Sequence, residues 1–147
     1  MDCLFCDFVN KKNKKHNDGI PFKTLHETKH SISFLSIDFP TTENGHILVI
    51  PKKHYANYEE IPNYILEDLF KHIKIIIKAL RIENQGNNIL LNNGSAAGQY
   101  ISHVHFHIIP RNDNDNIKIE VWKRKKFTKD EYNKLHKEMK NKISKVL

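Results

Sequence analysis

Residues 103–110 read His-Val-His-Phe-His-Ile-Ile-Pro, an alternation of histidine and apolar side chains that ends at a proline. Side chains on a β-strand point to opposite faces with a period of two, so the spacing predicts a strand over His103–Ile109 with three histidines on one face. Val104, Phe106 and Ile108 would then point into the core. Such histidines suit a metal site or a nucleophile supported by its neighbours, whereas a face chosen only for solvation would favour Thr, Lys and Glu.

A loop of small residues precedes this strand. It runs over Asn92–Gln99 and reads Asn-Asn-Gly-Ser-Ala-Ala-Gly-Gln, so its backbone N–H groups could approach an anion closely. Most glycine-rich loops are only turns, and this loop alone is a weak signal. Beside three histidines it suggests a phosphate held over an imidazole.

Hydrophobic patterning predicts the remaining elements. Apolar residues recur at helical spacing over Pro62–Glu83, which we expect to form one long helix, and a lysine-rich amphipathic helix should follow Thr128. The expected non-helical elements are two short antiparallel strands within Phe22–Ile37, a turn at Pro40–Gly45, a buried central strand at Ile47–Ile50 and a strand at Ile89–Leu91. The pattern indicates an α+β fold: an antiparallel meander sheet with helices on one face, one of them long, and a C-terminal helix.

Length and charge limit the class of protein. The 147 residues fit one domain, 1–147, with an N-terminal segment at 1–20 and a basic tail at 120–147. We find no secretory signal and no apolar run of about 18 residues, so we expect a cytoplasmic protein without a membrane partner. A net charge of +7 suits an anionic partner. Much of this charge lies in lysine-rich stretches that coding bias alone can produce, and nucleic acid is not the partner we expect.

Two cysteines near the N-terminus, Cys3 and Cys6, form a Cys-x-x-Cys motif. They are too close in sequence to stabilise a domain by closing a long loop. Metal binding or redox chemistry is the better interpretation, and two free buried thiols are the plain alternative. Two cysteines supply half of a tetrahedral zinc site, so two further ligands would have to come from elsewhere in the chain.

Three motifs, taken in order, resemble the histidine triad (HIT) family. They are Gly45-His46-Ile47-Leu48-Val49-Ile50-Pro51-Lys52-Lys53-His54, then Asn92-Asn93-Gly94 to Gly98-Gln99, then His103-x-His105-x-His107. The resemblance covers Cys3 to about Arg111. It implies a meander sheet with a long helix, usually a homodimer, that binds a purine nucleotide and hydrolyses or transfers its nucleoside monophosphate. The dimer would use the helix at 62–83 and the strand at 89–91.

The resemblance also implies roles for single residues. The middle histidine of the triad is the family's nucleophile, which makes His105 the catalytic residue that attacks the α-phosphate and forms a nucleotidyl-histidine. The substrate-binding residues would be His107 on the phosphate, Asn92 at the phosphate or leaving group, His46 behind the site, Gln99 in the loop, and Asp38 or Ser36 at the ribose. Neutral imidazole is a competent nucleophile near neutral pH, and loop N–H groups can stabilise the phosphate charge without a catalytic metal.

A zinc-carrying branch of the family resembles this chain in its N-terminal Cys-x-x-Cys motif. Its other ligands match His54 and His103, so the resemblance implies a structural zinc ion held by Cys3, Cys6, His54 and His103. No organic cofactor is expected. His105 and His107 would then be the two triad residues that face the nucleotide.

Several functions fit these motifs. The leading one is a hydrolase or transferase that acts on purine nucleotide derivatives, such as nucleoside phosphoramidates or adenylyl conjugates. A dinucleoside polyphosphate hydrolase would share the mechanism and differ in its leaving group. A non-catalytic nucleotide-binding adaptor would gain nothing from His105, and a nucleic-acid end-processing enzyme would need a DNA-binding module for which the chain has no room. The basic run Lys123–Lys126 is expected to draw in nucleotides by its charge.

Overall fold

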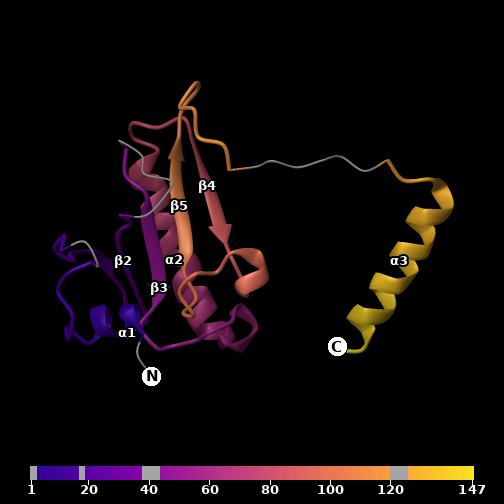
Figure 1. Cartoon of the computed structure of the whole chain (residues 1–147), viewed down its shortest axis with the longest axis horizontal. Helices are drawn as coiled ribbons and strands as arrows, with labels where there is room; N and C mark the ends of the chain where they lie inside the picture. Colours follow the sequence, from indigo (N-terminus) through magenta and orange to yellow (C-terminus); the bar gives the residue numbers. More distant parts are fainter. Residues whose placement is uncertain (1–2, 17–18, 38–43, 120–125) are drawn as a thin grey trace. The chain divides into compact units, whose positions relative to one another are not determined.

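The computed structural model describes residues 3–16, 19–37, 44–119 and 126–147, which belong to two compact units, 1–117 and 118–147. The first unit contains all the strands that the structure describes (Figure 1), and the three histidines belong to it as well. The second contains the whole tail expected at 120–147. Three expectations fall wholly or mostly outside the described residues: the ribose contact of Asp38, the turn at Pro40–Gly45 and the charge of the run Lys123–Lys126.

Five strands form one antiparallel sheet in the order β1-β2-β3-β5-β4. Their bounds are Thr24–Glu27 (β1), Ser31–Leu35 (β2), Ile47–Pro51 (β3), Gly86–Leu91 (β4) and Phe106–Arg111 (β5). The antiparallel pair β1 and β2 and the buried central strand β3 confirm the expectations from patterning. The α+β fold class is also confirmed.

Several strand boundaries differ from the sequence prediction, and among them β3 ends at Pro51 and β5 at Arg111, one and two residues later than expected. The strand expected over His103–Ile109 begins only at Phe106, because the N–H of Val104 donates to the carbonyl of Tyr55 (2.8 Å) and not to a neighbouring strand. The strand expected from Ile89 begins earlier, at Gly86, because the polar start of β4 pairs with the end of β5. The periodicity of side chains along a strand does not show which distant backbone group will bond to its ends, so it could not predict these two boundaries.

The sheet is covered on both faces, which corrects the expectation of helices on one face. Helix α2, Asn63–Leu80, lies behind the sheet in Figure 1. It packs on the face formed by Ile47, Val49, Val104, Phe106 and Ile108. The other face carries Ile32, Phe34, Leu48 and Ile50, and the short helix α1, Leu4–Val9, covers it with Phe5 and Phe8. Alternation along the strands makes both faces apolar, so each needs a cover.

Helix α2 begins directly after Pro62, as expected, and ends at Leu80, earlier than the expected Glu83. The N–H groups of Ile82 and Glu83 donate three residues back, which closes the helix as a turn. Two short 3-10 helices complete this unit, η1 at Tyr58–Glu60 and η2 at Ser95–Ala97.

The second unit contains the expected C-terminal helix, α3, Lys129–Ser144. A capping box starts it: the Thr128 side chain accepts from the N–H of Glu131, and the Glu131 side chain accepts from the N–H of Thr128. Among the described residues of both units, no helix combines the length and the apolar character that a membrane crossing requires.

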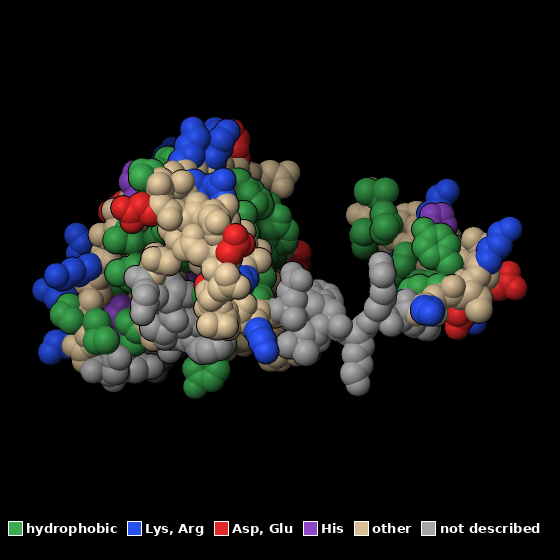
Figure 2. Space-filling view, turned by 90° about the horizontal axis from the view of Figure 1, so that it is seen from above, with side chains coloured by type: hydrophobic (Ala, Val, Ile, Leu, Met, Phe, Trp, Pro, Cys, Tyr) green, Lys and Arg blue, Asp and Glu red, His purple; other side chains and the backbone are tan. Residues whose placement is uncertain are grey.

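Basic side chains of the first unit lie in separate groups on the face that Figure 2 shows, with uncharged side chains between them. Among the described side chains of this face we see no continuous basic stripe. A stripe of that kind is the electrostatic footprint of nucleic-acid recognition.

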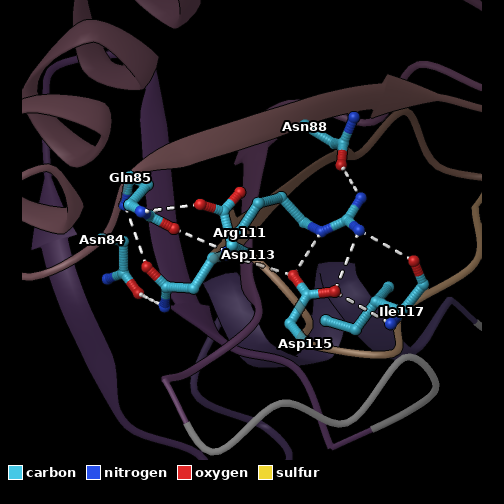
Figure 3. Close-up of polar contacts among 8 residues, drawn as sticks. Asn84, Gln85, Asn88, Arg111, Asp113, Asp115 and Ile117 are labelled. Atoms are coloured by element: carbon cyan, nitrogen blue, oxygen red, sulfur yellow. Dashed lines mark hydrogen bonds and ion pairs between the residues drawn. The ribbon is translucent and has the colours of Figure 1, made fainter.

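A dense polar network fixes the end of β5 (Figure 3). The Arg111 guanidinium donates through Nε and Nη2 to the Asp115 carboxylate (2.7 and 3.0 Å), through Nη2 to the carbonyl of Ile117 (2.8 Å) and through Nη1 to Asn88. The hydrogen bond from Arg111 holds the pKa of Asp115 well below its usual range. The network joins the start of β4 to the chain that leaves β5.

Candidate active site and metal centre

The histidine expected to act as nucleophile, His105, is 6% exposed and lies just before β5. Its Nδ1 is 2.7 Å from the carbonyl oxygen of His103. A carbonyl oxygen can only accept, so Nδ1 carries the proton and Nε2 keeps its lone pair. Burial lowers the pKa of His105, which keeps the ring neutral near pH 7. The structure thus holds an imidazole in the tautomer that a nitrogen nucleophile needs.

His107 and His46 form a pair beside this ring. Nδ1 of His107 is 2.9 Å from Nε2 of His46, and the rings of His105 and His107 are 4.9 Å apart. Burial, reinforced by the proximity of His105 and His46, lowers the pKa of His107 to about 3. Among the described residues, no group hydrogen-bonds to the buried Nε2 of His107. A buried polar atom without a hydrogen bond lowers the stability of the fold unless a ligand supplies that bond.

The loop expected at Asn92–Gln99 is held by its own side chains. The Gln99 amide accepts from the N–H of Gly94 (2.7 Å) and donates to the carbonyl of Ala56 (2.8 Å). Asn92 donates to the carbonyl of Gly98 at 3.4 Å. Gly94 and Gly98 have φ values of 88° and 86°, a region that favours glycine. Gln99 therefore positions the loop that precedes the histidines.

Two adjoining cavities lie next to these histidines. The smaller, of about 50 Å³, is lined in part by Phe5 and Ser36, and the ring of Phe5 lies 5.3 Å from that of His105. The larger, of about 410 Å³, is lined by Ser36, His46, Lys23 and several apolar side chains. The N–H of Ser36 donates to the carbonyl of His46 (2.7 Å). Ser36 therefore lines both cavities, the larger of them together with His46, while its expected ribose role stays a prediction and Asp38 is outside the described residues.

The four expected metal ligands lie together. Sγ of Cys3 is 3.5 Å and Sγ of Cys6 is 3.6 Å from Nδ1 of His103, while Sγ of Cys6 is 3.4 Å from Nδ1 of His54. All four donor atoms lie within 4.8 Å of one another. Sulfur and nitrogen ligands at tetrahedral zinc distances are about 3.5 Å apart. The cluster therefore has the chemistry and the dimensions of a four-ligand metal site.

The surroundings of the cluster also fit a metal ion. Nε2 of His103 lies 2.9 Å from the carbonyl of Pro51, so Nε2 carries the proton and Nδ1 presents its lone pair to the cysteines. Burial lowers the pKa of His103 to about 4, which keeps it neutral. Burial and then Cys3 raise the pKa of Cys6 to about 11, so without a cation the Cys6 thiol keeps its proton and a bound metal would displace it.

Two residues near the site were not anticipated from the sequence. Phe5 packs edge-on against the rings of both His103 and His105, at 5.8 and 5.3 Å. His16 lines both cavities from the N-terminal loop. The position of Phe5 between the two cysteines was the available signal. His16 stands in a polar, lysine-rich stretch, where nothing in the sequence distinguishes it from its neighbours.

Comparison with known proteins gives a consistent result. The family model of the HIT domain matches residues 17–114. Over 137 residues the chain is 39% identical to adenosine 5′-monophosphoramidase HNT1 of Saccharomyces cerevisiae, covering 93% of this chain and 80% of that protein. The structure is similar to a histidine triad nucleotide-binding protein from Candida albicans, with a TM-score of 0.81, 35% identity, and 99% and 100% of the two chains covered. A Zn-bound histidine triad family protein from Mycobacterium smegmatis is similar at a TM-score of 0.69 and 27% identity, over 100% of this chain and 99% of that one.

Proposed function

The chain belongs to the HIT family and is a hydrolase of that family, and from this premise we propose that it cleaves purine nucleotide derivatives at the α-phosphate. An adenosine 5′-phosphoramidate is the substrate class with most support, since the Saccharomyces cerevisiae relative is named for that activity. The observation that carries the proposal is the fixed tautomer of His105, whose Nδ1 donates to the His103 carbonyl and leaves Nε2 able to attack.

The reaction would proceed in two displacements. In the first, the Nε2 lone pair of His105 forms a bond to phosphorus while the bond from phosphorus to the leaving amine breaks, and the amine departs with that electron pair and takes up a proton. In the second, water attacks phosphorus and releases a proton, which balances the proton taken up by the amine, while the bond to Nε2 breaks and its electron pair returns to the imidazole. Nucleoside monophosphate leaves, and the ring is neutral again.

His107 and the loop would stabilise the charge that develops on the phosphate. If Nδ1 of His107 accepts from His46, Nε2 of His107 carries a proton and can donate to a non-bridging oxygen. Asn92 and the N–H groups of Ser95 and Ala96 would supply further donors, because the N–H groups of Gly94, Ala97 and Gly98 are already bonded within the loop that Gln99 holds in position. His46 acts behind the site by orienting His107.

We propose that the ion held by Cys3, Cys6, His54 and His103 is zinc, in a structural role. Sulfur and imidazole ligands in a closed set of four are typical of structural zinc, and a HIT-family structure with zinc is among the similar ones. The ion would attach the N-terminal residues around α1 to the segment that carries His105. That attachment would hold Phe5 against the nucleophile.

We also propose a homodimer formed through α2 and β4, in a cytoplasmic setting. β4 is an edge strand, and Ile89 on it is 48% exposed, while Phe70 on α2 is 49% exposed. A second copy could cover both. Free cysteines suit a reducing compartment. Light scattering at micromolar concentration should give twice the mass of one chain.

The proposed function is tested by turnover and by trapping the intermediate. Purified protein is assayed on adenosine and guanosine 5′-phosphoramidates, adenylyl sulfate and dinucleoside polyphosphates. In parallel, rapid quenching with substrate labelled at the α-phosphate should give label bound to protein that is stable in alkali and lost in acid, as expected for a histidine phosphoramidate. Turnover without bound label would contradict His105 as nucleophile. Absence of turnover on every substrate would contradict the hydrolase itself.

A further inference from the structure

A third cavity is lined by the end of α1, the loop that follows it, β1 and β2. Its volume is about 300 Å³, at the lower end of the range for pockets that hold small molecules. We call it the lysine cavity, because Lys11, Lys14 and Lys52 contribute to its lining. Among the described residues, no side chain lines both this cavity and either of the two cavities beside the histidines. The proposed hydrolysis therefore makes no use of it.

The apolar part of this lining is held in place by packing. The rings of Phe8 and Phe22 stack at 4.1 Å, and Val9 and Ile32 lie beside them in the same hydrophobic cluster. Phe8 and Ile32 are only 2% and 4% exposed, so the packing of the sheet fixes their positions. The N–H of Phe22 also donates to the carbonyl of Lys14 (2.8 Å), which ties the loop to this wall. A ligand with an apolar body would therefore meet a preformed surface.

An irregularity in the edge strand β1 brings polar side chains to the lysine cavity. Thr24 pairs with Phe34 and Glu27 pairs with Ile32, and the register shifts by one residue between Thr24 and His26. In a regular strand, residues three apart point to opposite faces, but the extra residue puts Thr24 and Glu27 on the same face as Ile32. Both line the cavity. Bulges at sheet edges re-aim side chains in this way.

The charged part of the lining has an excess of positive charge. Three lysines against one glutamate leave a net charge of +2. Nζ of Lys52 is 2.6 Å from the Glu27 carboxylate and 2.5 Å from the carbonyl of Thr28, so this pair largely satisfies itself. Among the described residues, neither Lys11 nor Lys14 takes part in an ion pair. Two ammonium groups are therefore available to an anion at this cavity.

The backbone of Lys11 is strained in a way that its side chain can explain. Lys11 has a φ of 58°, in the left-handed region that favours glycine. It directly follows the end of α1, where its N–H donates to the carbonyl of Phe8 (3.2 Å) and the N–H of Lys12 donates to the carbonyl of Asp7 (2.9 Å). Glycine is the usual residue at this position of such a helix end. A lysine here can serve a ligand in the cavity, or it can complement the last carbonyls of the helix, and the test separates these roles.

We propose that the lysine cavity binds a small amphipathic anion, a monocarboxylate with an apolar body such as a medium-chain fatty acid. The carboxylate would lie at Lys11 and Lys14, and the apolar body would cover Phe8 and Phe22. An inorganic anion would leave these rings uncovered. The chain's own C-terminal helix does not complement the two lysines, because lysines outnumber acidic residues in Lys129–Ser144. This inference does not depend on the proposed nucleotide function.

The test is calorimetric titration of the full-length protein with three probes. Octanoate has the proposed chemistry, butanoate shortens the apolar body, and octylammonium reverses the charge of the head group. The proteins are wild type, Lys11→Asn, Lys14→Gln and Glu27→Gln. A matched control, Lys23→Gln, removes one positive charge from the lining of the larger cavity beside the histidines. The Tm of each protein is measured without a probe.

We expect wild type to bind octanoate at least about tenfold more tightly than butanoate, because the added methylene groups are buried, and not to bind octylammonium. Lys11→Asn and Lys14→Gln should each weaken octanoate binding by about twofold to fivefold, the effect of one exposed charge pair. Glu27→Gln should tighten it by a similar factor, because Lys52 can then turn to the ligand. Lys23→Gln should bind as wild type. Lys11→Asn should keep or raise the Tm, since asparagine tolerates the left-handed region.

Four results would overturn the inference. Wild type that does not bind octanoate has no such site, and equal binding of octylammonium would show an apolar surface without selection for charge. A loss in Lys23→Gln as large as in Lys11→Asn would place the ligand in the larger cavity. A lower Tm of Lys11→Asn with unchanged octanoate affinity would show that Lys11 serves the helix end. None of these results bears on turnover of nucleotides, which the assay of the proposed function measures separately.

Discussion

The strand β5 carries a polar cluster at each end, and the two clusters differ in how their hydrogen bonds are completed. At Arg111, the guanidinium bonds to Asp115, Asn88 and the carbonyl of Ile117 (Figure 3). At His107, four residues earlier in the chain, one ring nitrogen is bonded to His46, and the buried Nε2 has no partner among the described residues. In the first cluster the described residues bond to one another, whereas in the second a ligand could supply the partner that the described residues do not give to Nε2 of His107.

The two ends of β5 also differ in what lowers the pKa values of their side chains. Around Arg111 opposite charges meet, and the pKa of Asp115 falls because its charged form is stabilised. Around His107 several histidines are buried together, and their pKa values fall because the charged form is penalised. A cluster of the first kind stabilises the fold. A cluster of the second kind costs stability and provides neutral nitrogens for chemistry.

The largest expected effect is the loss of activity when the histidine end of β5 is changed. Changing His105 to Gly or Ala removes the nucleophile and should lower kcat roughly 10⁴-fold or more, with nucleotide affinity within about tenfold, because attack contributes mainly to the transition state. Single-turnover kinetics and calorimetric titration measure the two quantities. Turnover by the purified alanine variant above a contaminant control would contradict the role of His105.

Removing the metal is expected to have the next largest effect. Wild-type protein purified without chelator should contain one zinc per chain, and the double variant Cys3→Ser, Cys6→Ser should contain none. Chelation or the double change should lower Tm by roughly 10 °C or more, because a closed metal site anchors the N-terminal segment. Zinc retained by the double variant, or absent from the wild type, would refute the assignment.

Lowering the pH should affect the stability contributed by the two ends of β5 differently. The pKa of His107 is about 3 in the folded chain and near 6.5 when unfolded, so the unfolded state binds one more proton between these values and stability falls as pH falls through that window. The slope is about 1.4 kcal/mol per pH unit for one such group. Denaturant unfolding of His107→Gln should therefore show a shallower loss between pH 6.5 and 4 than wild type.

Asp115→Asn is the matched control for the acid experiment. Asp115 has a lowered pKa, so its contribution is present above the unfolded value for aspartate and is lost only as pH falls below it. This variant should be less stable than wild type near neutral pH but should keep the wild-type slope between pH 6.5 and 4. Equal slopes for wild type and His107→Gln would show that His107 is not held neutral by the fold.

The smallest effect is expected at Arg111. Arg111→Met removes the donors to Asp115, Asn88 and Ile117, and Tm should fall by roughly 3 to 8 °C while kcat/KM stays within about twofold. Arg111→Lys should recover little of this loss, because an ammonium group cannot reproduce the planar fork. A tenfold fall in kcat/KM with unchanged Tm would mean that the two ends of β5 are not independent.

The sequence predicted those features that depend on local periodicity. Alternation along the chain separated the three histidines of residues 103–107 from Val104, Phe106 and Ile108, and the structure has this apolar set facing α2. The central strand β3, helix α2 and helix α3 followed from the same kind of pattern. Periodicity succeeds here because the face that a side chain takes is set by the geometry of its own strand or helix.

Only the tertiary structure decided which distant groups meet these side chains. The tautomer of His105 depends on where the His103 carbonyl lies, and β5 begins at Phe106 because the carbonyl of Tyr55 takes the N–H of Val104. The place of α1 on the second face of the sheet and of His16 at the cavities follows from the same rule. A pattern along the chain shows where a side chain points, whereas its partner comes from another segment that the fold brings to it.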